Sequence, residues 1–89
     1  MTAYLVSYDL KAPGKNYDSL IKYLKSHTNW WHHLGSTWVI VTNLSATQLR
    51  DGIAEHADDN DKFLVVKSGG IGAWSGFSTE GSEWLRKQL

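Results

Sequence analysis

The sequence predicts an α+β domain in which helices cover one face of an antiparallel sheet. Residues 3–8 and 37–42 are rich in the β-branched and aromatic side chains that favour strands. Residues 16–26 carry apolar side chains at i, i+3, i+4 and i+7, the spacing of one helical face. Ser45 and Gln48 form a capping-box pattern, which predicts the start of a second helix.

The first strand ends on a carboxylate, Asp9, and the turn at residues 11–15 follows it, with Pro13-Gly14 as the strongest turn signal. The helix after this turn is expected to pack four apolar side chains on the sheet. They are Tyr17, Leu20, Ile21 and Leu24. Lys22 and Lys25 lie off this stripe, so we expect them to be solvated.

Residues 29–42 predict a hairpin, with arms at 30–34 and 37–42 joined by a tight turn at Gly35-Ser36. The second helix runs from residue 46 to about residue 57. Gly52 inside this helix costs up to about 1 kcal/mol relative to Ala, which suggests a close contact between helix and sheet.

Residues 58–61 are acidic and are expected to form a solvated loop. A metal site is the alternative, although the spacing lacks the Gly and closing Glu of an EF-hand. Residues 62–67 predict a fourth strand, and residues 71–77 are irregular or form a short extra strand. Ser78 or Thr79 then begins a last helix, which buries Trp84 and Leu85.

The predicted order is β-α-β-β-α-β, the ferredoxin-like arrangement, followed by a C-terminal tail. We expect one domain over residues 1–89, with its core at about 3–68 and its tail at about 69–89. Several strands are apolar on both sides, which predicts that both sheet faces are buried. The tail or a second copy must therefore cover the second face, and a homodimer packed through its sheets is the expected solution.

Charge and composition limit the function classes. The chain has no net charge: residues 1–44 carry four Lys and two Asp (+2), and residues 45–89 carry five basic and seven acidic side chains (−2). A dedicated nucleic-acid binder is usually more basic, so Lys11, Lys15, Lys22 and Lys25 are the candidates for a local patch. The absence of Cys excludes thiolate sites and fits a cytoplasmic protein, and we expect neither a signal peptide nor a membrane span.

Asp9 is the first candidate for a chemical role, because loops and ligands gather at the ends of sheet strands. Its ordinary alternative is a turn residue. His32 and His33 are expected to point to opposite faces of a strand, so they do not form a zinc site together. One of them, His33 in our preferred assignment, could act as a general base near Asp9; the alternative is a partly exposed strand residue.

The Trp-rich hairpin has two interpretations. Trp30, Trp31 and Trp38 could offer exposed rings on which the bases of a single-stranded nucleic acid stack. Burial in the core or in a dimer contact is the alternative, and it is the ordinary role of large aromatic side chains.

The segment Tyr-Leu-Val-Ser-Tyr-Asp-Leu at residues 4–10 and Gly-Ser-Thr-Trp-Val-Ile-Val at residues 35–41 resemble the CRISPR-associated protein two superfamily and its small relatives outside CRISPR loci. The resemblance covers roughly residues 3–68. It implies a ferredoxin-like homodimer in which two copies of Asp9 share a divalent metal, Mg²⁺ or Mn²⁺. Some members of that family are metal-dependent nucleases, and others are DNA-binding subunits.

The resemblance and the residues together leave two functions open. The first is a non-catalytic binding or assembly module related to nucleic acids, contacting them through Lys11 and Lys15. The alternative is a metal-dependent endonuclease that acts on RNA or DNA through paired Asp9 carboxylates. The tail at 69–89, with Trp74 and Trp84, departs from the family pattern.

Overall fold

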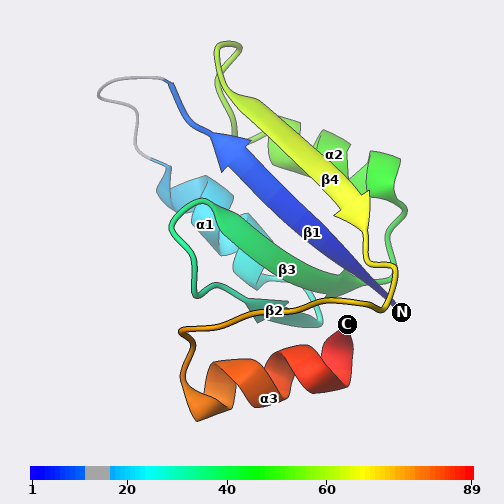
Figure 1. The fold of residues 1–89 in the computed structure, drawn as a ribbon. Helices are drawn as coiled ribbons and strands as arrows, with labels where there is room; N and C mark the ends of the chain where they lie inside the picture. Colours follow the sequence, from blue (N-terminus) through cyan, green and yellow to red (C-terminus); the bar gives the residue numbers. More distant parts are fainter. Residues whose placement is uncertain (12–16) are drawn as a thin grey trace.

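The computed structural model describes residues 1–11 and 17–89, and these residues form a ferredoxin-like α+β fold with a third, C-terminal helix (Figure 1). The elements follow the predicted order. In chain order they are β1 (Thr2–Asp9), α1 (Asp18–Lys25), β2 (Asn29–Trp31), β3 (Thr37–Thr42), α2 (Ala46–Ala54), β4 (Lys62–Lys67) and α3 (Thr79–Gln88).

The four strands form one antiparallel sheet in the order β2-β3-β1-β4, with β3 and β1 as its two inner strands. The register places Val6 of β1 between Trp38 of β3 and Val65 of β4. Because side chains alternate along a strand, these three residues share one face of the sheet. The two edge strands are β2 and β4.

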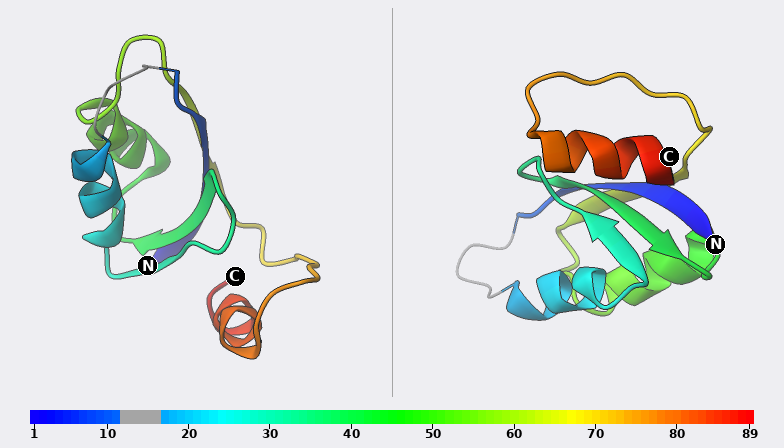
Figure 2. Two further views of the ribbon diagram at one scale, coloured as in Figure 1. Left: turned by 90° about the vertical axis from the view of Figure 1, so that its left-hand side faces the viewer. Right: turned by 90° about the horizontal axis from the view of Figure 1, so that it is seen from below.

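Helices α1 and α2 cover that face and enclose the main core (Figure 2). Its fully or nearly fully buried side chains are Tyr4, Val6, Leu20, Leu24, Trp38, Ile40, Leu49 and Ile53. Each such aliphatic side chain stabilises the fold by about 1.5–3 kcal/mol relative to exposure. The predicted buried stripe of the first helix is confirmed for Leu20 and Leu24, with Tyr17 and Ile21 packed at its margin.

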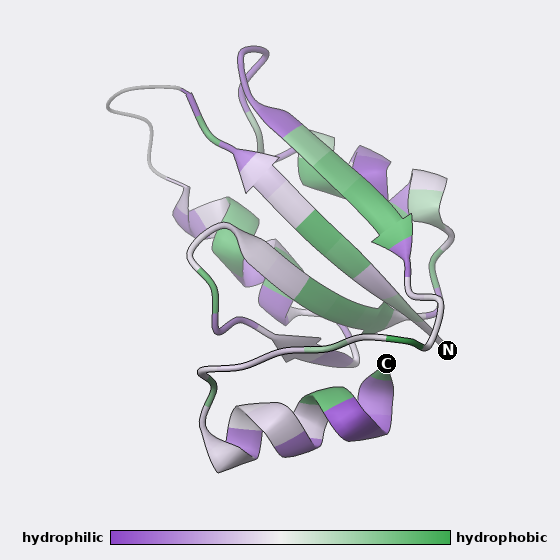
Figure 3. Cartoon of the chain, viewed as in Figure 1, coloured by the Kyte–Doolittle hydropathy of each residue, from purple (hydrophilic) through white to green (hydrophobic). Residues whose placement is uncertain are grey.

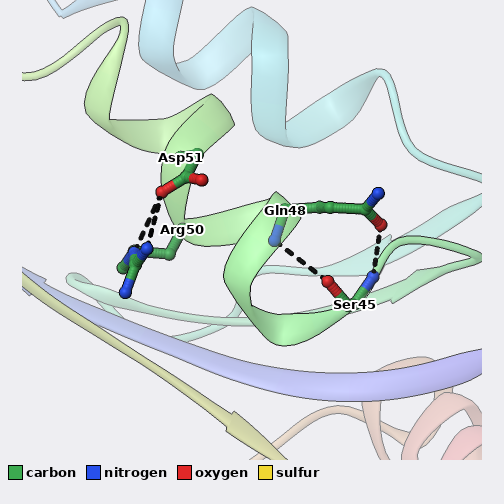
Figure 4. A network of polar contacts seen from close by, with 4 residues as sticks. All are labelled: Ser45, Gln48, Arg50 and Asp51. Atoms are coloured by element: carbon green, nitrogen blue, oxygen red, sulfur yellow. Dashed lines mark hydrogen bonds and ion pairs between the residues drawn. The ribbon is translucent and has the colours of Figure 1, made fainter.

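The predicted capping box begins α2 (Figure 4). The Gln48 backbone N–H donates to Ser45 Oγ at 3.1 Å, and the Ser45 N–H donates to Gln48 Oε1 at 2.9 Å. These two bonds satisfy donors that the first helical turn otherwise leaves free. One turn further on, Arg50 and Asp51 form an exposed ion pair with each other.

Gly52 marks a contact between two helices, so the expected contact with the sheet is wrong. A Cβ at this position would lie 1.8 Å from the hydroxyl oxygen of Tyr23, which α1 contributes. The Tyr23 ring also stacks on His56 and meets His27 edge-on. The glycine therefore allows α1 and α2 to approach through this aromatic ring.

The tail after β4 crosses to the second face of the sheet and places α3 there (Figure 2). No strand forms in residues 69–77, which settles the choice between irregular chain and extra strand. Leu85 packs with Trp31 and Val39 in a second, smaller core. Two indole groups fix the helix: Trp31 Nε1 donates to the Gly81 carbonyl at 3.1 Å, and Trp84 Nε1 donates to Asn29 Oδ1 at 2.9 Å.

The hairpin differs from the prediction. Strand β2 ends at Trp31, which pairs with Val39, so residues 32–36 form a five-residue connection and no tight turn at Gly35-Ser36. His32 and His33 therefore lie in a loop. They still diverge, because His32 stacks on Trp38 of the main core at 3.8 Å, whereas His33 lies near Phe77 of the tail.

In the described part of the chain, none of the three helices has the length and apolar character needed to cross a bilayer.

Candidate functional site: the open half of the sheet

The second face of the sheet is covered over only half of its width. Helix α3 lies beside β2 and packs on Val39 of β3. The part over β1 and β4, which we call the open half, presents six side chains: Leu5, Ser7, Asp9, Lys62, Leu64 and Val66. Leu64 is 58% exposed, and Leu5 and Val66 are also exposed. Figure 3 shows the hydrophobic stretches of these two strands side by side.

Asp9 lies at the end of β1, as the sequence predicts, and its side chain is on this same face. Its side chain is 60% exposed, and its Oδ2 atom lies 3.2 Å from Lys11 Nζ. The register also places Lys62 directly opposite Asp9 on β4. The carboxylate is therefore an exposed group flanked by two cations, at the rim of a shallow hollow between β1 and β4.

This arrangement limits what one chain offers a metal ion. Among the residues that the structure describes, no cluster of three or more His, Asp or Glu side chains could hold one. Mg²⁺ and Mn²⁺ prefer several oxygen ligands, and Asp9 would also have to exchange its contact with Lys11. A metal at Asp9 therefore requires oxygen ligands from outside a single copy.

Asp61 is the residue that sequence reasoning missed. Its carboxylate accepts hydrogen bonds from the backbone N–H of Lys11 at 2.7 Å, the hydroxyl of Tyr17 at 2.9 and 3.0 Å, and the N–H of Asp58 at 2.7 Å. It ties the end of β1 and the start of α1 to the loop before β4. Asp61 therefore has a structural role within the acidic loop, where we expected solvated carboxylates or, as the alternative, a metal site.

Of the predicted basic residues, the structure places Lys11 at the end of β1. Lys11 is exposed beside Asp9, and Lys15 lies outside the described residues. The contact with Asp61 brings the acidic loop of residues 58–61 to the same end. Among the described residues at this end of the sheet, carboxylates outnumber lysines.

Lys25 and Trp30 form a different pairing on the β2 edge. The Lys25 Nζ atom lies 5.2 Å from the centre of the Trp30 ring, within the range of a cation–π contact. Trp30 is 37% exposed, whereas Trp31 and Trp38 are buried. Of the three rings considered for base stacking, Trp30 is the one that solvent reaches.

His33 is not placed as a base for Asp9. The hollow beside Asp9 is lined by residues of β1 and β4 alone. The His33 ring instead lies 5.1 Å from Trp31 and 3.4 Å from where a Cβ on Gly81 would stand. Its contacts are those of a residue that packs between the hairpin loop and the tail.

Two pKa shifts occur at the contact of α1 and α2, away from the open half. Burial lowers the pKa of His27 below its usual 6.5, and its Nε2 atom has no hydrogen-bond partner in the described structure. Burial and the nearby Glu55 carboxylate raise the pKa of Tyr23. Both groups are therefore held in their neutral forms near pH 7.

No family model, no curated protein and no solved structure matches this chain in the three comparisons made.

Proposed function

We propose that this chain is a cytoplasmic, homodimeric binding or assembly module whose partner is a nucleic acid. The observation that carries the proposal is the open half of the sheet. Large contiguous apolar patches on a protein surface often mark interaction sites. Leu5, Leu64 and Val66 form a contiguous apolar patch on two adjacent strands, and a second copy packed on it would bury all three.

The apolar patch supports association but does not by itself secure it. Complete burial of one aliphatic side chain is worth about 1.5–3 kcal/mol, and these three residues are only partly exposed. The loss of translational and rotational freedom costs about 4–15 kcal/mol on association. A stable dimer therefore has to bury more surface than the open half alone. The neighbouring tail is the additional surface that we expect it to use.

For the nucleic acid, the Lys25–Trp30 pair meets the requirements of a stacking platform better than the end of β1. Stacking needs an accessible aromatic ring beside positive charge. Trp30 supplies the ring, and Lys22 and Lys25 supply two exposed cations on the adjacent helix α1. A single strand lying along this edge would leave the open half free for a second copy.

Two measurements test the proposal. Light scattering over a range of protein concentrations should give the mass of a dimer. Fluorescence anisotropy with labelled single-stranded DNA and RNA should show binding that weakens as salt rises, because bound phosphates release counterions. Trp30→Ala should weaken binding by about 1–3 kcal/mol, the usual value of one stacked base. The control is Lys87→Gln on α3, which should bind as the wild type does. Equal binding by Trp30→Ala and the wild type would exclude the β2 edge as the nucleic-acid-binding site.

The second candidate function is a metal-dependent endonuclease built from two copies of Asp9. The observation that favours it is the position of Asp9 on the open half, the face through which a second copy would pack. Two facing copies would supply two carboxylates, and a divalent ion there could activate water near a phosphodiester.

Cleavage assays with Mg²⁺ or Mn²⁺ test the second candidate. Asp9→Asn should abolish cleavage, whereas Asp51→Asn, which alters another exposed carboxylate paired with its own cation, should not. Cleavage that persists in Asp9→Asn would assign it to another site or to contamination.

A further inference from the structure

Ile71 is almost completely exposed, which is unusual for a large aliphatic residue in an ordered tail. Its exposed fraction is 96%, the highest among the exposed large hydrophobic residues of the described chain. It follows Gly70, whose φ of +81° is a conformation that favours glycine, and it precedes Gly72. The chain therefore turns at Gly70, directly before the exposed Ile71 side chain.

The segment that carries Ile71 forms the wall of an apolar cavity of about 310 Å³. The cavity lies between the tail and the second face of the sheet. Its floor is Leu5, Thr37 and Val39, and exposed Leu34 is at its rim. Trp31 of β2 also lines the cavity, and the tail supplies the rest of the lining, including Trp74, Phe77 and Leu85.

Ile71 does not fill the cavity of its own chain, because it is absent from the lining although its neighbour Gly72 belongs to it. The Leu89 side chain occupies the space beside Gly72, since its Cδ1 atom would lie 3.3 Å from a Cβ on that glycine. One molecule therefore presents an exposed aliphatic side chain beside a largely apolar cavity that this side chain does not line.

We propose that Ile71 of each protomer inserts into this cavity of a second copy. The inference rests on the proposed homodimer and adds its central contact. A two-fold axis makes the exchange reciprocal, because the same side chain and cavity exist on both copies. The cavity is continuous with the open half through Leu5, so one interface covers both.

The size of the molecule supports the participation of the tail. The broad side of the protomer measures 35 × 27 Å. A stable interface buries about 800 Å² on each partner. A dimer packed through this side therefore needs most of its area, and the open half over β1 and β4 is only part of it. The tail with Ile71 supplies the rest.

Disulfide trapping tests the contact, and the natural absence of Cys makes it clean. Ile71→Cys and Leu34→Cys are prepared as separate proteins and mixed under mild oxidation. Any disulfide between them is then intermolecular. Both positions are exposed, so the substitutions should leave the fold intact, which circular dichroism checks. We expect a cross-linked heterodimer to form at least about 10-fold faster than in the control pair of Ile71→Cys with Lys22→Cys on the opposite face.

A second variant measures the strength of the contact in solution. Ile71→Ser removes the Ile71 side chain from both protomers of the dimer and should raise its dissociation constant by at least about 100-fold, because two buried aliphatic side chains are lost. A wild-type dimer that shows neither the trapped pair nor this weakening would overturn the insertion and leave the homodimer standing. A wild-type protein that stays monomeric up to millimolar concentration would overturn both.

Discussion

The contact between Gly52 and Tyr23 predicts that Gly52→Ala destabilises the wild-type protein but stabilises a protein in which Tyr23 is replaced by Ala. In a helix interior, replacing Gly by Ala is favourable by about 0.5–1 kcal/mol, because Ala loses less backbone entropy on folding. Gly52 has no positive φ that would oppose this change. The helix alone therefore predicts that Gly52→Ala stabilises the protein.

The neighbouring helix reverses this expectation. The new Cβ would stand 1.8 Å from the Tyr23 hydroxyl oxygen and 2.4 Å from its Cζ atom, so the ring must move. Moving it disrupts the contacts with His27 and His56. Overpacking of this kind costs about 1–3 kcal/mol, so we expect Gly52→Ala to lower the free energy of unfolding by about 1–2 kcal/mol.

A double-mutant cycle measures the coupling. In a Tyr23→Ala background the obstacle is gone, and Gly52→Ala should now raise the free energy of unfolding by about 0.5–1 kcal/mol. Gly81→Ala serves as the control, since its Cβ would stand 3.4 Å from the His33 ring and should not destabilise α3. Urea unfolding followed by Trp fluorescence at one protein concentration gives all values. Stabilisation by Gly52→Ala in the wild-type background would refute the reasoning.

Three further predictions concern side chains that hold elements together. Burial lowers the pKa of His27, so the contribution of its neutral ring to the free energy of unfolding is complete above pH 6.5 and declines as pH falls through the folded pKa. Unfolding curves from pH 7.5 to 5.5 should show this decline in the free energy of unfolding, and His27→Gln should make the decline smaller. Trp84→Phe removes the indole donor to Asn29 and should lower the stability of α3 by about 0.5–1.5 kcal/mol. Amide hydrogen exchange should then become faster in α3 than in α2. Asp61→Asn weakens the hydrogen bonds from Lys11 and Tyr17 and should cost about 1–3 kcal/mol in thermal unfolding, while exposed Asp59→Asn should cost almost nothing.

The features that the sequence predicts well depend on neighbours a few residues apart. The apolar spacing of α1 identifies Leu20 and Leu24 because helical periodicity alone places them on one face. The Ser45–Gln48 box begins α2 because both hydrogen bonds close within one turn. The order of the elements then limits the topology to few arrangements, so the ferredoxin-like sheet follows.

The features that the sequence does not predict depend on partners distant in the chain. Asp61 reaches Tyr17 across 44 residues, and no local pattern distinguishes it from Asp59 in the same acidic loop. Gly52 signals a close approach, but only the packing of the helices identifies Tyr23 as the neighbour. The predicted ends of the hairpin strands are wrong for a related reason. The pairing of Trp31 with Val39 is fixed by the register of the whole sheet and not by the residues Gly35-Ser36.

The tail decides which part of the second sheet face stays available. Residues 79–88 need Leu85 and two indole hydrogen bonds to stay on the sheet, and all three anchors lie over β2 and β3. With α3 fixed there, the apolar residues of β1 and β4 remain uncovered beside Asp9. The segment that returns toward α3 also carries Ile71 and lines the cavity next to Leu5. One C-terminal extension therefore completes a small core over β2 and β3 and leaves the β1 and β4 part of the same sheet face exposed.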